Sequence, residues 1–408
     1  MISNPLSDQL ALADLLPNAG HPRTLRQCEL QVTRSSSPES DTLWELEPAT
    51  NAKHRLYRSY LDAWFPILLQ NEYTRRVTYV DAFAGPGEYL GGDQGSPIFA
   101  IERLLGHAAR TRMRLSRDRV TMIFIEARRD RYEHLMRLLV DKFGALENLP
   151  INVVVKRGNA ESDLMPLLDK HGAWGNPILA VFDSWGNVSV PWNDMRRIGR
   201  NPSSEIIVTF GPNWFSRQEG PSRAQLDAVF GGPEFWTLSD PAWTPEQRWR
   251  NWFTTYRSAV IRAGYSYPLM FEVCPSTGQP LYLVFGTAHP KGVEAFKTAM
   301  WEVDFENGMR FNDPRTTAGK ADAFARVQGS LFEDENAPDQ DLLDSVAYAL
   351  SVKPRTLDEI KEFLQNETPR WLSKHAREAV KYMLADGMIV REDRRGRLTG
   401  ISGLRLAQ

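Results

Sequence analysis

Short apolar runs recur along much of the chain, and several of them end in an acidic residue. The runs, each written with the residue that ends it, are 77–81, 120–126, 151–155, 177–183 and 205–210. Continuous apolar runs of this length are typical of strands that are buried on both faces of a sheet. Helical patterns separate them, and this alternation predicts an α/β fold with a doubly wound, Rossmann-like parallel sheet.

Two later apolar runs, 267–274 and 281–286, are separated by only six residues. A parallel crossover needs a dozen or more residues, so this last pair of strands must be antiparallel. A helix over residues 291–301 is predicted to close the domain. Residues 211–265 interrupt the alternation with an aromatic-rich insertion, which is either a lid or substrate platform, or a cap on the sheet edge.

The turn after the first strand has the composition of a ligand-binding loop. Asp81 ends the strand, Gly85 and Gly87 follow, and Ser96 with Pro97 begins a helix. Glycine lets the backbone approach a ligand closely, because it has no Cβ. Alone, the pattern also describes a plain strand-to-helix turn, since the full dinucleotide fingerprint is absent.

Two further strand ends add polar groups to the same edge of the sheet. Glu126 ends the second strand, where a carboxylate accepts from ribose hydroxyls, and Asn159 follows the third. NAD fits less well than S-adenosylmethionine, whose amino acid portion Asp81 can face and which has no pyrophosphate to bind. The predicted cofactor-binding residues are Asp81, Phe83, Ala84, Gly85, Gly87, Glu126, Asn159 and Ala160.

Several segments together resemble the three-Cys-motif partner protein (TcmP) family. They are residues 81–89, Gly95-Ser96-Pro97, Lys53-His54, and the stretches 60–64, 283–287, 290–292 and 299–301. The likeness covers residues 44–305. That family is similar to class I S-adenosylmethionine-dependent methyltransferases, so the resemblance implies a seven-stranded sheet with an antiparallel last pair. It also implies a separately encoded partner that carries the three-cysteine motif.

A helix over residues 52–70 precedes the first strand, with apolar positions at three- and four-residue steps. Lys53 and His54 lie off its apolar side. They either point to the mouth of the ligand site, where they would bind substrate together with Tyr89, or belong to a solvated face.

The residues after the fourth strand bear on the methyl acceptor. Asp183-Ser184-Trp185-Gly186 departs from the Asp-Pro-aromatic-Gly that the family usually has. Asp183 and Trp185 are the predicted catalytic residues: the carboxylate would accept from an exocyclic amine, and the indole would stack on a base. The alternative is that Asp183 caps a helix and Trp185 is a packing residue.

The rest of the chain divides into an N-terminal arm over 1–43, a polar linker over 306–340 and a C-terminal domain over 341–408. Predicted helices at 342–351, 356–365 and 370–386, followed by a hairpin, are the layout of a winged helix-turn-helix domain. Its basic residues are predicted to contact nucleic acid, although many such domains bind protein instead. They are Arg370, Lys374, Arg377, Arg394, Arg395 and Arg397.

Composition narrows the classes of function. The net charge of −2 gives no overall attraction to nucleic acid, so a local patch would have to supply it. Two cysteines exclude a disulfide scaffold, and the scattered histidines predict no metal site. Without an apolar run of about 18 residues or a signal-like N-terminus, the protein is expected to be cytoplasmic.

Three functions are compatible with these features. The leading hypothesis is an S-adenosylmethionine-dependent methyltransferase-like enzyme that acts on nucleic acid or with a nucleic-acid-associated partner. The second is a catalytically silent scaffold that serves the three-cysteine-motif partner. The third is a metal-dependent nuclease that would hold a cation with Asp81, Glu126 and Asp183.

Overall fold

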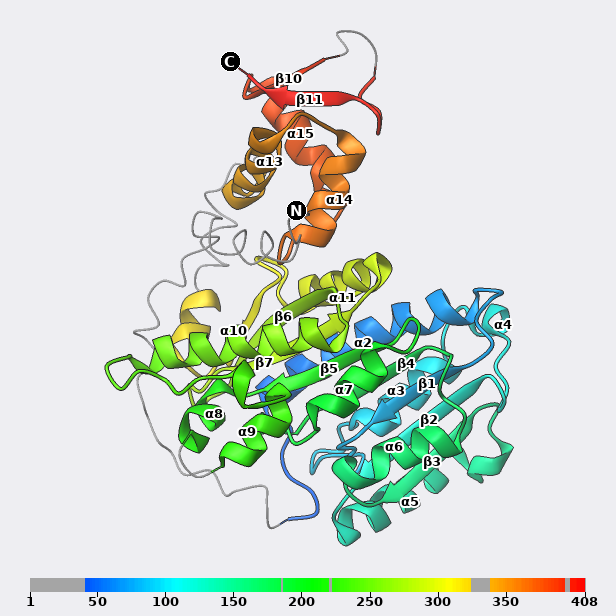
Figure 1. The fold of residues 1–408 in the computed structure, drawn as a ribbon. Coiled ribbons are helices and arrows are strands. Elements are labelled where there is room, and N and C mark those ends of the chain that lie inside the picture. Colours follow the sequence, from blue (N-terminus) through cyan, green and yellow to red (C-terminus); the bar gives the residue numbers. More distant parts are fainter. Residues whose placement is uncertain (1–40, 185, 220–221, 324–337, 393–396, 408) are drawn as a thin grey trace. The chain divides into compact units, whose positions relative to one another are not determined.

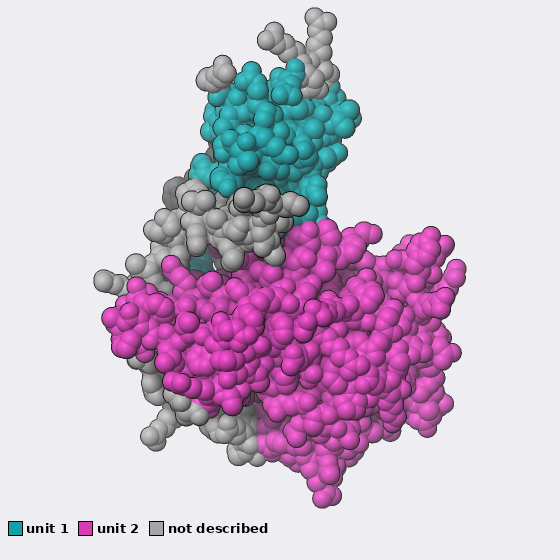
Figure 2. Space-filling view, in the orientation of Figure 1, with its two compact units in different colours: residues 1–27, 320–408 teal, residues 28–319 magenta. Residues whose placement is uncertain are grey.

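The computed structural model describes residues 41–184, 186–219, 222–323, 338–392 and 397–407. The described residues up to Gly319 belong to one compact unit and those from Lys320 onward to a second (Figures 1 and 2). Of the predicted N-terminal arm, only residues 41–43 are among those described. No helix in the described ranges is long and apolar enough to cross a membrane.

The larger unit is built on a mixed sheet with the strand order β3-β2-β1-β4-β5-β7-β6-β8 (Figure 1). The strands are β1 Val77–Asp81, β2 Val120–Glu126, β3 Asn152–Arg157, β4 Ile178–Phe182, β5 Glu205–Phe210, β6 Tyr267–Cys274, β7 Leu281–Thr287 and β8 Arg310–Asn312. The first five pair in parallel, whereas β7 is antiparallel to both β5 and β6. The predicted doubly wound sheet and its antiparallel last pair are therefore confirmed.

The eighth strand comes from the stretch that was expected to be linker. β8 pairs in parallel with β6, and Arg310 forms an ion pair with Glu272 at 2.8 Å. The buried carboxylate of Asp304 accepts from the backbone N–H groups of Met309 and Arg310, which turns the chain back onto the sheet. The sequence did not predict this strand because the stretch around it is polar in composition. The strand lies half-exposed at the sheet edge, where no apolar run is needed.

Helices cover both faces of the sheet, with separate clusters of buried side chains (Figure 1). On one face lie α2 Pro48–Leu69, α3 Ser96–Leu105, α4 Arg110–Met113, α5 Arg129–Phe143 and α11 Pro290–Val303. On the other lie α6 Ala160–Lys170, α7 Trp192–Gly199, α8 Pro212–Gln218, α9 Arg223–Phe230 and α10 Pro245–Ala263. Side chains alternate between the faces, so Tyr79 of β1 joins the first cluster and Val80 the second.

The aromatic-rich insertion is a cap on the second face of the sheet. Phe215, Phe230, Trp252 and Tyr256 are all fully buried there. Phe210 of β5 stacks on Phe215 and Tyr256, with ring centroids 4.6 and 4.5 Å apart. Because these rings are inside the core, they form no platform for a ligand. The insertion does cap the sheet, but it covers a face and not the expected edge.

The second unit contains three helices and a small sheet. The helices are α13 Gln340–Val352, α14 Leu357–Glu367 and α15 His375–Ala385, and the sheet has the order β10-β11-β9. Its strands are β9 Arg355–Thr356, β10 Ile389–Arg391 and β11 Gly403–Leu406. The three predicted helices are present. The second hairpin strand lies later than the expected 394–399, because Leu404 is the apolar residue that enters the core.

A buried carboxylate stands between α2 and the sheet of the larger unit. Glu205 of β5 accepts from the Tyr60 hydroxyl of α2 at 2.5 Å and from Thr287 Oγ1 at 2.8 Å. Position 292 of α11 requires glycine, because a Cβ there would lie 2.2 Å from Glu205 Oε1. Burial raises the pKa of Glu205 to about 7, since the interior disfavours its charged form.

The raised pKa makes a prediction about stability. The folded protein holds a proton on Glu205 up to a pH of about 7, whereas the unfolded chain releases it near the ordinary carboxyl pKa. The stability that this proton contributes is complete below the ordinary carboxyl pKa and is lost as the pH rises to about 7. Glutamine resembles the protonated side chain at every pH. We expect Glu205→Gln to gain stability relative to the wild type by ~3 kcal/mol across this pH range. Urea denaturation of both proteins at several pH values measures the difference, and a pH-independent difference would contradict the assignment.

Candidate functional site

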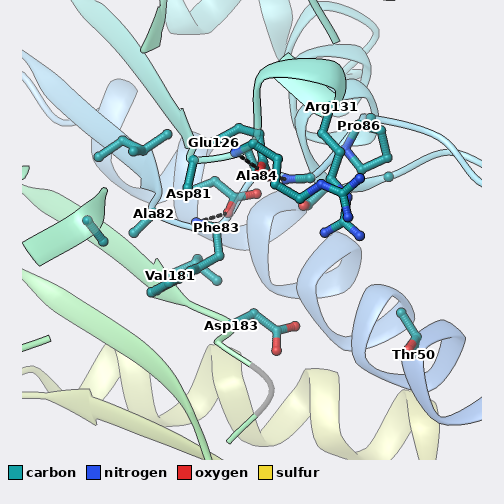
Figure 3. A pocket seen from close by; sticks show the side chains of 18 of the residues that line it. Thr50, Asp81, Ala82, Phe83, Ala84, Pro86, Glu126, Arg131, Val181 and Asp183 are labelled. Carbon is teal, nitrogen blue, oxygen red and sulfur yellow. Dashed lines mark hydrogen bonds between the residues drawn. The ribbon is translucent and has the colours of Figure 1, made fainter. Parts of the chain in front are cut away.

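A cavity of about 540 Å³ opens at the carboxyl ends of the central strands, beside α2 (Figure 3). Asp81 of β1, Glu126 of β2 and Asp183, which follows β4, all line it. The strand order reverses between β1 and β4, and ligands of open α/β sheets bind at such a switch point. The cavity therefore lies at the end of the strands where the sequence predicted a ligand site.

The glycine loop forms part of the cavity wall. Gly85 and Gly87 have φ angles of 66° and 89°, in the left-handed region that glycine adopts without strain. A Cβ on Gly87 would lie 2.8 Å from the side chain of Leu135, so this glycine also permits close packing against α5. Phe83 and Ala84 line the cavity beside them.

Glu126 holds two loops in place. One of its oxygens accepts from the Gly85 N–H at 2.9 Å and the other from the Arg128 N–H at 2.7 Å. Burial raises the pKa of Glu126, and these two backbone hydrogen bonds partly offset the rise. Each carboxylate oxygen retains acceptor capacity for a hydroxyl of a ligand.

Asp81 is the most deeply buried acid of the cavity and is 1% exposed. One oxygen accepts from the Phe83 N–H at 3.2 Å, whereas Oδ2 has no hydrogen-bond partner among the described residues. Burial raises the pKa of Asp81 to about 6, although the nearby Ser96 side chain and the Phe83 N–H act against this. A buried oxygen without a partner is unfavourable, so a donor from a bound ligand would stabilise it.

Asn159 and Ala160 line the far end of the cavity, at the start of α6. Asn159 is the N-cap residue, and its N–H donates to Asp163 at 2.9 Å. The predicted cofactor-binding residues are thus all brought to one cavity. Sequence reasoning missed several side chains there, among them Trp44 and Arg131, whose guanidinium lies 4.5 Å from the Trp44 ring centroid.

Lys53 and Asp183 form a largely buried ion pair at the α2 side of the cavity, with side chains 7% and 19% exposed. Lys53 Nζ lies 2.7 Å from both oxygens of Asp183. Thr209 Oγ1 donates to Oδ1 at 2.7 Å, and the Tyr57 hydroxyl lies 3.4 Å from Oδ2. Burial alone would raise the pKa of Asp183, but the charge and hydrogen bonds of Lys53 and the Thr209 hydroxyl hold it below its ordinary value.

His54 is buried next to this pair. Burial, together with the charges of Lys53 and Arg58, lowers the pKa of His54 to about 3, so the imidazole is neutral. Its Nε2 lies 3.4 Å from the Tyr89 hydroxyl. Lys53 and His54 are only 6% and 4% exposed, so the solvated-face interpretation of these two residues was wrong.

Of the two predicted catalytic residues, only Asp183 is among those that the structure describes. Asp183 caps no helix, because the next one, α7, has Pro191 at its N-cap. Trp185 lies outside the described residues. Tyr57 and Thr209, which contact Asp183, were missed because nothing in the local sequence connects them to position 183.

The predicted nucleic-acid residues of the second unit do not form one set. Arg370 is 7% exposed and pairs with Asp341 at 2.9 Å, so it supports the fold and is not available to a phosphate. Lys374 and Arg377 line a surface hollow with Lys381 and Tyr382. Arg397 is exposed, and Arg394 and Arg395 lie outside the described residues.

No three His, Cys, Asp or Glu side chains in the described ranges are placed to hold a metal ion together. In the nuclease hypothesis Asp81, Glu126 and Asp183 hold the cation, but Asp183 is paired with the Lys53 ammonium. A nuclease that uses Asp81, Glu126 and Asp183 therefore has no geometric support.

No protein-family model matches the chain, and no curated protein matches it. The solved structures similar to it include Trm1 from Pyrococcus horikoshii in complex with S-adenosyl-L-methionine (12% identity, TM-score 0.35), with 64% of this chain and 62% of that chain covered. EvdMO1 is another (13%, 0.31), with 83% and 61% covered. A third is geranyl diphosphate methyltransferase in complex with GPP and sinefungin (15%, 0.29), with 56% and 78% covered.

The chain thus covers less than two thirds of the first two of these proteins. Likenesses this remote assign neither a cofactor nor a substrate to this chain. The family suggested by its sequence motifs has no support from the comparisons.

The buried ion pair makes a prediction about stability. Removing one partner of a buried pair leaves an uncompensated charge, so we expect Lys53→Met to lower the free energy of unfolding by ~3 kcal/mol or more. The double variant Lys53→Met/Asp183→Asn, which has neither charge, should recover most of that loss. Urea denaturation of the two single variants and the double variant gives the coupling free energy, and additive effects would show that the pair does not act as a unit.

Proposed function

We propose that the protein is an S-adenosylmethionine-dependent methyltransferase. The observation that carries the proposal is the cavity at the switch point, where a glycine loop meets the carboxylates of Asp81, Glu126 and Asp183. The Asp81 carboxylate, which lines the cavity, supports a cationic ligand in particular, because an ammonium group would donate to it.

The described residues fit the parts of S-adenosylmethionine. Glu126 would accept from the ribose hydroxyls, Asp81 and the loop around Gly85 would bind the amino acid portion, and Asn159 with Ala160 would lie beside the base. When bound, this cofactor supplies an electrophilic methyl group on a positively charged sulfur. Asp183 and Lys53 belong to the part of the cavity that would receive the methyl acceptor.

Calorimetric titration with S-adenosylmethionine and S-adenosylhomocysteine tests this proposal. We expect Glu126→Gln to weaken binding by about tenfold or more, because the ribose hydroxyls would then meet a neutral acceptor instead of a charged one. Since Asp81 ionises with a pKa of about 6, affinity should rise as the pH increases through that value, and Asp81→Asn should remove the rise.

Glu133→Gln is the matched control, because Glu133 is an exposed acid of α5 that pairs with Arg129 outside the cavity. It should bind both ligands as the wild type does. If neither ligand binds the wild type, or if Glu126→Gln and Glu133→Gln behave alike, the proposal fails.

We further propose that the second unit, for which we retain the winged helix-turn-helix interpretation, binds nucleic acid. Lys374, Arg377 and Lys381 follow one another at three- and four-residue steps and line one hollow of about 450 Å³. A basic row of this kind suits a phosphate backbone. Glu378 lies in the same hollow and limits its positive charge.

Binding of the full chain to a DNA or RNA duplex at several salt concentrations tests this row. Lys374→Ala/Lys381→Ala should weaken binding and reduce the slope of log K against log salt by about 2, because two phosphates would no longer be neutralised by lysine. Lys353→Ala/Lys361→Ala is the control, because these lysines of the same unit pair with Glu359 and Asp358. Equal slopes in both variants would remove the nucleic-acid proposal.

One observation favours the second candidate function, a catalytically silent protein that serves a separately encoded three-cysteine-motif partner. Asp183, where an acceptor amine would bind, is already occupied by the chain's own lysine. Such a protein would bind the cofactor without transferring its methyl group. Co-purification with the partner, without S-adenosylhomocysteine formation, would favour it over the enzyme.

A further inference from the structure

The hydrogen-bonding capacity of Asp183 is filled by the protein itself. A carboxylate offers about four lone-pair sites. Lys53 takes one on each oxygen, Thr209 a further one on Oδ1, and the Tyr57 hydroxyl lies nearest the last at 3.4 Å. Asp183 is therefore poorly placed to accept hydrogen bonds from a substrate.

This occupancy disfavours a neutral amine as the methyl acceptor. A neutral amine has one lone pair, which must attack the methyl carbon, so it can be held only through its N–H donors. Those donors need an acceptor at the place of attack. The carboxylate that would serve is the one engaged by Lys53.

Lys53 donates hydrogen bonds, whereas a neutral amine would need a group that accepts them. An ammonium group has three N–H donors. Within the described part of the chain, both hydrogen bonds of Lys53 go to Asp183, and the side chain lines the cavity. The remaining donor is available to a hydrogen-bond acceptor in the cavity.

The neighbouring side chains of His54, Tyr57 and Tyr89 carry no charge. His54 is neutral at physiological pH, and its Nδ1 has no hydrogen-bond partner among the described residues. The hydroxyls of Tyr57 and Tyr89 belong to rings that line the cavity, and burial raises the pKa of both, so they stay protonated. The acceptor region is thus aromatic, with the Lys53 ammonium as its cationic donor.

We propose that the methyl acceptor is an ionised oxygen, a carboxylate or a phenolate, which is held by Lys53. The inference rests on the proposed methyltransferase function. An ionised oxygen has three lone pairs, so one accepts from Lys53 while another attacks. The new C–O bond forms as the C–S bond of the sulfonium breaks, and the released electron pair goes to sulfur. An anion and a sulfonium yield a neutral ester or ether and a thioether, and no proton has to be removed.

Binding of small aromatic probes to the protein saturated with S-adenosylhomocysteine tests this assignment. Benzoate carries the ionised oxygen, and aniline, of similar size, carries an amine that is neutral at pH 7. We expect saturation-transfer NMR at pH 7 to detect benzoate and not aniline, and Lys53→Met to weaken benzoate binding by about tenfold. Lys291→Met, which removes an exposed lysine outside the cavity, should leave benzoate binding unchanged.

Lys53→Met leaves Asp183 without its counter-charge, so Lys53→Met/Asp183→Asn is the second variant and should lose benzoate binding equally. Preferential binding of aniline, failure of benzoate to bind, or unchanged benzoate binding in the double variant would overturn the inference. S-adenosylhomocysteine binding is measured first. If it is absent, the proposed function fails, whereas its presence with a negative benzoate result removes this inference alone.

Discussion

The buried carboxylates beneath α2 are the constraint on which the larger unit depends. Asp183 and Glu205 come from neighbouring strands and lie on the sheet face that α2 covers. A buried carboxylate is unfavourable unless its oxygens are paired. Lys53, Tyr57 and Tyr60 supply those partners from one side of the helix, at three- and four-residue steps. Polar contacts therefore fix the position of α2 along the sheet, which apolar packing alone would leave less sharply defined.

The same contacts join the helix to the cavity. Lys53 belongs both to the pair that anchors α2 and to the wall of the cavity. At the other wall, Glu126 connects the loops after β1 and β2 through the N–H groups of Gly85 and Arg128. Its backbone carbonyl also accepts from the Gly158 N–H in the loop after β3. The strand ends are thus fixed relative to one another by the chain's own bonds, and this preorganises the site.

Sequence reasoning reached the sheet, its antiparallel last pair and the edge that bears the cavity, because apolar runs and terminal acids are local signals. It missed β8, whose half-exposed residues carry no apolar run, and it assigned Arg370 to nucleic acid although Asp341 neutralises it inside the fold. The sequence also could not predict the ion pair between Lys53 and Asp183. Both residues were selected as site residues, but their contact spans 130 positions and is set by how α2 crosses the sheet.

That separation has a consequence for the order of folding. Lys53 is made early in synthesis, whereas Asp183 and Thr209 follow much later. Contacts so distant in sequence close slowly, because a long loop must be ordered before they form. Until β4 and β5 are in place, the lysine that ends up inside the protein has no counter-charge and stays in water. The α2 side of the cavity is therefore complete only once these long-range contacts have formed.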